Sequence, residues 1–217
     1  MFKKNLKAKT IVESAKGNKM LKRNTMIYTE LSPNPNSMKF VLNYEIVPEG
    51  LSFDYPDMKS ALEESKASPL AADFFQFPFV QRVFISSNFI TLTKDTETEW
   101  DEVVFDLKKF LKIYFDENQP VFAQKTIDSN TLIVNASDGP VIAKIKATLD
   151  QYVRPAVESD GGAINFSSFD EDSGLVKVFL QGSCSGCPSA TITLKSGIER
   201  LLTSMIPEVK LVEAEGI

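Results

Sequence analysis

The chain has 217 residues, of which 43% are hydrophobic and 24% are charged, and it contains two cysteines and no histidine. This composition is ordinary for a globular protein, and the length allows one or two domains. Without histidine there can be no Ser-His-Asp or Cys-His catalytic system, no imidazole proton shuttle at neutral pH and no histidine-ligated zinc or haem. Metal chemistry would have to use thiolates or carboxylates. Two cysteines cannot form a disulfide framework, which favours an intracellular protein over a secreted one.

The charge is distributed unevenly. Residues 1–24 carry eight basic residues against one acidic residue, a net charge of +7, and the rest of the chain carries 16 bases and 28 acids, or −12. An acidic body argues against a nucleic-acid partner, and no apolar run approaches the roughly 18 residues of a membrane span. We expect residues 1–25 to be a basic flexible leader. A plain tail, or a true translation start at Met20 or Met26, is favoured over a targeting peptide, because presequences prefer arginine and this segment has seven lysines and one arginine.

The first folded region is expected at residues 26–122, where hydrophobic periodicity and turn residues predict the elements. In chain order these are a strand at 38–42, two short helices within 57–77 of which the second opens at Pro69, strands at 80–86 and 89–94 joined by a tight turn, and a helix from about Trp100 to Tyr114. Twelve of the sixteen phenylalanines lie between Phe40 and Phe122, which predicts a separate aromatic core.

Residues 123–139 have a weaker pattern and are interpreted as a linker, and residues 140–217 form the second expected domain. Its predicted elements are a helix from Pro140, capped by Ser137 or Asp138 and ended or bent at Arg154-Pro155, a strand near 163–169, a turn at 171–174, an alternating strand with Val176, Val178 and Leu180 on one side, a helix through Leu194 to Met205, and a strand at 209–212. Asp160-Gly161-Gly162 is interpreted as a simple turn whose glycines take positive φ. The expected fold class is α+β, with two small mixed domains, the second being αββαβ.

Both cysteines lie in one short segment, Gly182-Ser183-Cys184-Ser185-Gly186-Cys187-Pro188, which is expected between a strand and a helix. The two-residue spacing lets both sulfurs turn toward one point, and Gly186 relieves the backbone strain of such a loop. If Pro188 lies in the first turn of the next helix, Cys187 is at its positive end. Unpaired amides and the helix dipole favour thiolate there.

Four interpretations of Cys184 and Cys187 remain open from the residues alone. The pair can be a thiol–disulfide redox couple, half of a four-cysteine zinc site, half of an iron–sulfur site, or two buried small hydrophobes. The last fits poorly with a segment rich in glycine, serine and proline. A cofactor with four thiolate ligands would need two chains, which predicts a symmetric homodimer around it.

The same residues carry a resemblance to a known family. Residues 154–162, the cysteine segment and residues 193–202 resemble the NifU C-terminal domain, an iron–sulfur cluster scaffold and carrier module. The first half is similar to the Nfu N-terminal domain at residues 33–40, 68–71, 89–94 and Trp100. The resemblance covers about residues 28–115 and 140–214. Its departures are mild, with Ala163 where an acid is common and Ser183 where alanine is frequent.

The resemblance implies a carrier and not an enzyme. It implies that Cys184 and Cys187 ligate a [4Fe–4S] cluster bridged between two subunits and passed to apo-proteins, with [2Fe–2S] still open because the ligand number is the same. The implied partners are apo iron–sulfur proteins, an assembly system such as a cysteine desulfurase and scaffold, and a second copy of the chain, with no nucleic acid and no membrane. The alternatives are a thiol–disulfide oxidoreductase using the same cysteines and a zinc-bridged structural dimer. The expected location is the bacterial cytoplasm, ahead of a mitochondrial or plastid matrix.

Overall fold

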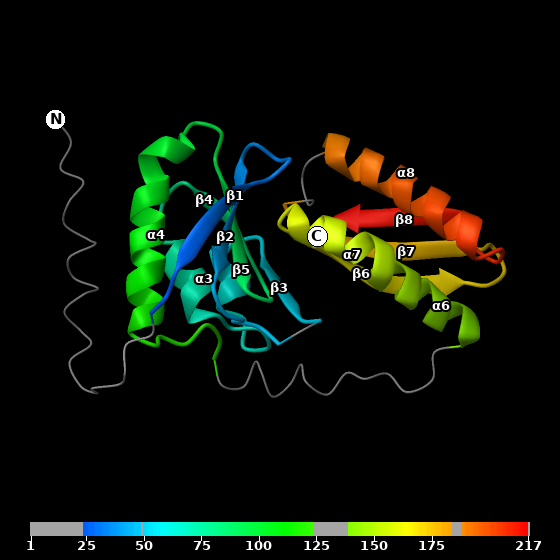
Figure 1. Ribbon diagram of the computed structural model, residues 1–217, viewed down its shortest axis with the longest axis horizontal. Helices are drawn as coiled ribbons and strands as arrows, with labels where there is room; N and C mark the ends of the chain where they lie inside the picture. The colour runs from blue at the N-terminus through cyan, green and yellow to red at the C-terminus, as the bar shows by residue number, and fades with distance from the viewer. Residues whose placement is uncertain (1–23, 49, 124–138, 184–187, 217) are drawn as a thin grey trace.

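The computed structural model describes residues 24–48, 50–123, 139–183 and 188–216, and within them the chain forms two sheets (Figure 1). The first half contains a five-stranded sheet with strand order β1-β2-β5-β4-β3, and the second half a three-stranded sheet with order β6-β7-β8. A separate hydrophobic core accompanies each sheet. The expected α+β class with two mixed domains is therefore confirmed.

The described elements of the first half match most of the predicted ones. The strands are β1 (Ile27–Leu31), β2 (Ser37–Leu42), β3 (Ser52–Tyr55), β4 (Val80–Ser86) and β5 (Phe89–Lys94), and the helices are α2 (Met58–Ala61), α3 (Pro69–Phe74) and α4 (Trp100–Asp116). Neighbouring strands are antiparallel. The sequence analysis missed β1 and β3. Strand β1 is largely exposed at the sheet edge, and the alternation of polar and apolar residues in β3 covers only four residues, so neither gives a strong strand signal.

Local chemistry explains where the short helices begin and where the central hairpin turns. The hydroxyl of Ser68 accepts the Ala71 N–H (3.1 Å) at the N-terminus of α3, and Pro69 occupies the first helical position, as predicted. The tight turn between β4 and β5 places Ser87 at φ 43°, in the left-handed region. These signals are local, which is why the sequence alone located them.

The five-stranded sheet has two different faces. Apolar side chains of β2, β3, β4 and β5 alternate onto one face and pack against α3 and α4, as with Phe40, Ile90 and Leu111. The other face carries polar residues mixed with Phe84 and Phe89, and it lies against the second sheet. Figure 1 shows the resulting order, with α4 on one side of the sheet and the C-terminal domain on the other.

The second half has the expected αββαβ order, with differences in detail. Its described elements are α6 (Pro140–Thr148), the π-helical turn η1 (Leu149–Val153), α7 (Arg154–Ser159), β6 (Gly162–Asp170), β7 (Leu175–Gly182), α8 (Pro188–Met205) and β8 (Leu211–Gly216). Strand β7 is central, antiparallel to β6 and parallel to β8. The helices pack on the face formed by Val176, Val178 and Leu180, the residues predicted to share one side.

Three predictions for this half need correction or fall outside the described residues. The predicted end or bend at Arg154-Pro155 comes earlier in the chain, since α6 ends at Thr148. The wider turn η1 then accommodates a proline that lacks an N–H, and α7 continues to Ser159. The last strand begins at Leu211, since Val209 is buried in the core ahead of it. The N-cap is Gly139, and the predicted caps Ser137 and Asp138 lie outside the described residues.

Candidate functional site

The cysteine segment is framed by β7 and α8. Strand β7 ends at Gly182 and helix α8 begins at Pro188, so the predicted placement between a strand and a helix is confirmed. Cys184 and Cys187 themselves lie outside the described residues. In sequence, Cys187 directly precedes Pro188, the first residue of α8.

The turn before β6 holds the end of β7. Gly161 has φ +84° and Gly182 has φ +70°, conformations that favour glycine. The Ser183 N–H donates to the carbonyl of Gly161 (3.3 Å), and the Ser183 hydroxyl donates to the carbonyl of Asp160 (2.5 Å). The interpretation of Asp160-Gly161-Gly162 as a turn is confirmed for Gly161, whereas Gly162 is already part of β6. The turn has a further role that the sequence analysis missed, since it anchors the residue just before Cys184.

Two side chains of the N-terminal sheet form hydrogen bonds with the backbone at the end of β7 and in the turn before β6. The carboxylate of Asp54 accepts the Gly182 N–H through Oδ2 (3.0 Å), and the Thr91 hydroxyl donates to the carbonyl of Gly161 (2.7 Å). Arg82 holds Asp54 through two hydrogen bonds, from Nε to Oδ1 (2.7 Å) and from Nη2 to Oδ2 (2.9 Å). The backbone immediately before the cysteine segment is therefore hydrogen-bonded by residues of both domains.

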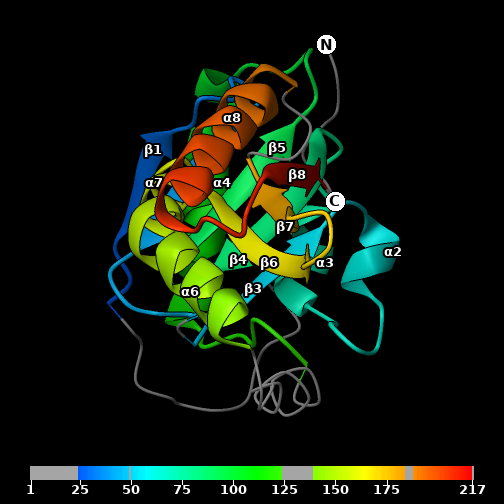
Figure 2. The same cartoon turned by 90° about the vertical axis from the view of Figure 1, so that its right-hand side faces the viewer.

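Additional contacts extend this interface. The Ser52 hydroxyl donates to Gln181 Oε1 (2.9 Å), and the same oxygen accepts from Asn165 (2.8 Å). Phe84 and Phe89 of the first sheet form one buried cluster with Ala163 of β6. Figure 2 looks onto the C-terminal domain, with β3 and β4 of the N-terminal sheet behind β6. The two domains thus meet through both hydrogen bonds and an apolar contact.

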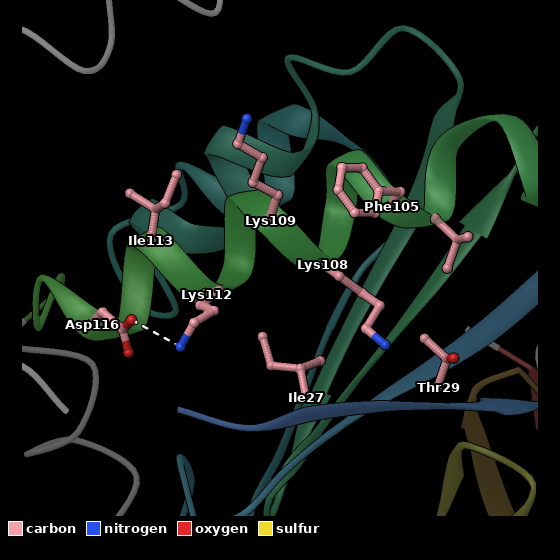
Figure 3. A pocket seen from close by; sticks show the side chains of 9 residues that line it. Ile27, Thr29, Phe105, Lys108, Lys109, Lys112, Ile113 and Asp116 are labelled. Carbon is pink, nitrogen blue, oxygen red and sulfur yellow. Dashed lines mark ion pairs between the residues drawn. The ribbon is translucent and has the colours of Figure 1, made fainter. Parts of the chain in front are cut away.

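A groove of about 670 Å³ lies on the opposite side of the N-terminal sheet, between β1 and α4 (Figure 3). Its apolar lining includes Ile27 and Phe105, and three lysines of α4 and one acid complete it. One of these lysines, Lys112, pairs with Asp116 (3.0 Å). The lining contains no thiol, so the groove offers no counterpart to the cysteine segment.

The described residues contain no other candidate metal centre. No three of their histidine, cysteine, aspartate or glutamate side chains come together as potential ligands. Likewise, no helix in the described part of the chain is long and apolar enough to cross a membrane. The candidates from the sequence, Cys184 and Cys187, lie outside the residues searched.

Comparison with known proteins agrees with the resemblance seen in the motifs. Residues 27–118 match the family model described as scaffold protein Nfu/NifU N terminal, and residues 145–213 match the NifU-like domain. The chain is 39% identical over 196 residues to NifU-like protein 4, mitochondrial, of Arabidopsis thaliana, covering 89% of this chain and 67% of that protein. It is 38% identical to the NFU1 iron-sulfur cluster scaffold homolog, mitochondrial, of Drosophila willistoni, covering 89% of this chain and 65% of the relative.

Among solved structures, the chain is similar to a NifU-like protein from Saccharomyces cerevisiae determined by NMR in solution. The sequence identity is 21% and the TM-score 0.40, with 51% of this chain and 92% of that chain covered. This likeness is too distant to support an argument. The chain spans about two thirds of the length of the curated relatives above.

The expectation of a bacterial cytoplasmic protein is wrong. The chain matches relatives from Arabidopsis and Drosophila that are named as mitochondrial. The prediction failed because the high lysine content of residues 1–24 was taken as evidence against a targeting peptide.

Proposed function

The chain belongs to the family of NifU-like iron–sulfur cluster scaffold proteins, and we propose that it carries a [4Fe–4S] cluster between two subunits and delivers it to apo-proteins. In this proposal Cys184 and Cys187 of each subunit are the cluster ligands. The observation that carries it is the Cys-x-x-Cys pair inside the matched NifU-like domain, between β7 and α8. The cluster is cargo, so the protein is a carrier and not a turnover enzyme.

Ligand number supports the homodimer. A [4Fe–4S] or [2Fe–2S] cluster takes four protein ligands, and one chain provides two thiols. A two-fold axis through the cluster would bring two identical segments together and complete the set with one interface. Since histidine is absent from the chain, mixed histidine and cysteine ligation cannot replace the second subunit.

Delivery proceeds by ligand exchange. In each step one iron–sulfur bond to Cys184 or Cys187 breaks and one bond to a client cysteine forms. The proton of the client thiol passes to the departing thiolate, and no electron is transferred. Thiolates at a helix N-terminus are relatively weak bases and good leaving ligands, which suits temporary binding. The partners are then apo iron–sulfur proteins on one side and an assembly system such as a cysteine desulfurase and scaffold on the other.

We place this activity in the mitochondrial matrix. The names of the relatives support the assignment, and the net charge of +7 in residues 1–24 is compatible with a presequence. Expression with a fluorescent protein at the C-terminus, with and without residues 1–24, tests it. Mitochondrial fluorescence that depends on residues 1–24 is expected, and diffuse fluorescence from both versions would contradict the assignment.

Anaerobic reconstitution followed by iron and sulfide analysis tests the carrier function. We expect four irons and four sulfides for every two chains, dimerisation on loading, and loss of both in Cys184→Ser and Cys187→Ser. Ser185→Ala is the matched control, because it changes the same segment without removing a thiol. A monomer with a reversible internal disulfide would support the oxidoreductase, and a colourless dimer with half a zinc per chain would support the structural zinc site.

A further inference from the structure

The cysteine segment follows a strand end whose backbone is hydrogen-bonded by the other domain. We propose that Asp54 and Thr91 are positioning residues for Cys184 and Cys187, so that the N-terminal domain sets the geometry and lability of the cluster site. This inference rests on the proposed function where it concerns the cluster. Its claim about the cysteines themselves can be tested without a cluster.

Asp54 acts where the pairing of β7 with β8 ends. Strand β8 pairs with β7 as far as Leu180 in the described residues, and the Gly182 N–H two residues later donates to the Asp54 carboxylate. The side chain of Asp54 is only 2% exposed, and Arg82 lies beside it. A buried carboxylate is tolerated when it is paired and hydrogen-bonded. Strand β6 still pairs with β7 at Gly182, and Asp54 supplies the acceptor for the Gly182 N–H, two residues before Cys184.

Thr91 acts on the turn before β6, which is hydrogen-bonded to the end of β7. The carbonyl oxygen of Gly161 accepts both the Thr91 hydroxyl and the Ser183 N–H. A carbonyl oxygen has two lone pairs, so these two donors use its full capacity. One backbone atom thus links the N-terminal sheet to Ser183, which immediately precedes Cys184.

Both glycines lie close to side chains of the N-terminal sheet. A Cβ atom on Gly161 would lie 2.8 Å from Thr91 Oγ1, and one on Gly182 would lie 2.8 Å from Phe84 Cδ1 and 2.7 Å from the Gly161 carbonyl oxygen. The cluster of Phe84, Phe89 and Ala163 closes the interface beside them. The N-terminal sheet is thus in close contact with the end of β7 and with the turn before β6.

Two substitutions test the inference in the full chain. Thr91→Val removes the hydroxyl at nearly constant volume, and Thr91→Ser restores it. Asp54→Asn removes the carboxylate charge while keeping the shape of the side chain. Thr93→Val is the matched control, because Thr93 lies on the same face of β5 and its hydroxyl bonds Ser37 (2.8 Å) within the N-terminal domain.

In the cluster-free protein we expect Thr91→Val and Asp54→Asn to raise amide hydrogen exchange at Gly182 and Ser183. The rate at which iodoacetamide alkylates Cys184 and Cys187 should differ about tenfold from the rate in the unmodified protein. This is the factor expected for loss of one buried hydrogen bond. Thr91→Ser and Thr93→Val should behave like the unmodified protein. After anaerobic reconstitution, the first two variants should lose iron to a chelator about tenfold faster with an unchanged visible spectrum, because the ligands are the same.

Exchange and alkylation rates equal to those of the unmodified protein in both variants would overturn the inference, even if the cluster binds normally. Faster exchange with unchanged alkylation and unchanged cluster loss would reduce the contact to a structural one and would also overturn it. An unmodified protein that holds no cluster would instead overturn the proposed function. The exchange and alkylation rates would then still decide whether the N-terminal domain positions the cysteines.

Discussion

The two faces of the N-terminal sheet are both buried, but by different means. One face is apolar and packs against α3 and α4 of its own domain, with Phe40 and Leu111 fully inaccessible. The other presents Asp54 and Thr91, also buried, to the backbone of the C-terminal domain. No buried side-chain nitrogen or oxygen in the described residues lacks a hydrogen-bond partner.

The difference separates stability from orientation. Apolar burial is roughly proportional to area and non-directional, so the first face holds the domain together without fixing one precise neighbour. Hydrogen bonds have defined distances and angles, so the second face can fix the other domain at particular backbone atoms. Substitutions on the two faces should therefore produce different losses.

The largest effect is expected on the apolar face. Phe40→Ala should lower the free energy of unfolding of the N-terminal domain by about 3–5 kcal/mol, because it removes a fully buried ring. Urea denaturation followed by tryptophan fluorescence reports this directly, since Trp100 contacts Phe40 with ring centroids 6.5 Å apart. Phe105→Ala, at a ring that is 73% exposed, should change the same quantity by less than about 0.5 kcal/mol. Equal losses from both variants would contradict the assignment of the two positions.

A comparable or slightly smaller effect is expected from an unpaired charge on the polar face. Arg82→Leu leaves the Asp54 carboxylate buried without its guanidinium partner and should cost about 3 kcal/mol. The double variant Asp54→Leu with Arg82→Leu should recover part of this loss, because no uncompensated charge remains. Chemical denaturation of the unmodified chain, Arg82→Leu, Asp54→Leu and the double variant closes the cycle. A double variant less stable than Arg82→Leu would show that the charge is not the cause.

A substitution at the end of β7 should have an effect of intermediate size on the free energy of unfolding. Gly182→Ala should cost about 1–3 kcal/mol, because alanine at φ +70° is strained and its Cβ would meet Phe84 and Gly161. Gly197→Ala in α8 should stabilise the protein by about 0.5–1 kcal/mol, since no atom lies within 4 Å of the added carbon. Thermal unfolding of both variants gives the two signs, and two losses of equal size would contradict the explanation.

The smallest effect concerns an exposed carboxylate, in contrast to buried Asp54. The pKa of Asp170 is lowered, first by the backbone hydrogen bond from Ser173. A folded-state pKa below the unfolded value of about 3.8 contributes stability above that value, and the contribution is lost as the pH falls through the folded pKa. Asp170→Asn should therefore be slightly less stable than the unmodified chain at pH 7, and the difference should be smaller near pH 2. Urea denaturation at both values measures the difference, and a gap that widens toward low pH would have the wrong sign.

Local patterns predicted much of this molecule. Turn residues and alternation located β2 and β7, the 3.6-residue period located α4, and the two-residue spacing with the family motifs singled out Cys184 and Cys187. These features succeed because each depends on neighbours within a few residues. The roles of the two cysteines as ligands remain a proposal.

The interdomain contacts could not be predicted in the same way. Asp54 and Gly182 are 128 residues apart in the chain, and Thr91 and Gly161 are 70 apart. A polar residue that alternates with apolar ones gives the same pattern whether water or another domain covers it. Strand β3 does alternate polar and apolar residues, but its four residues are too few for the alternation alone to identify a strand.

Native mass spectrometry of the anaerobically loaded full chain is the most direct test of a cluster shared by two subunits. The account predicts one species with the mass of two chains plus four irons and four sulfides, absent from Cys184→Ser and Cys187→Ser. A loaded species with the mass of a single chain, or a dimer whose added mass is one zinc ion, would contradict it.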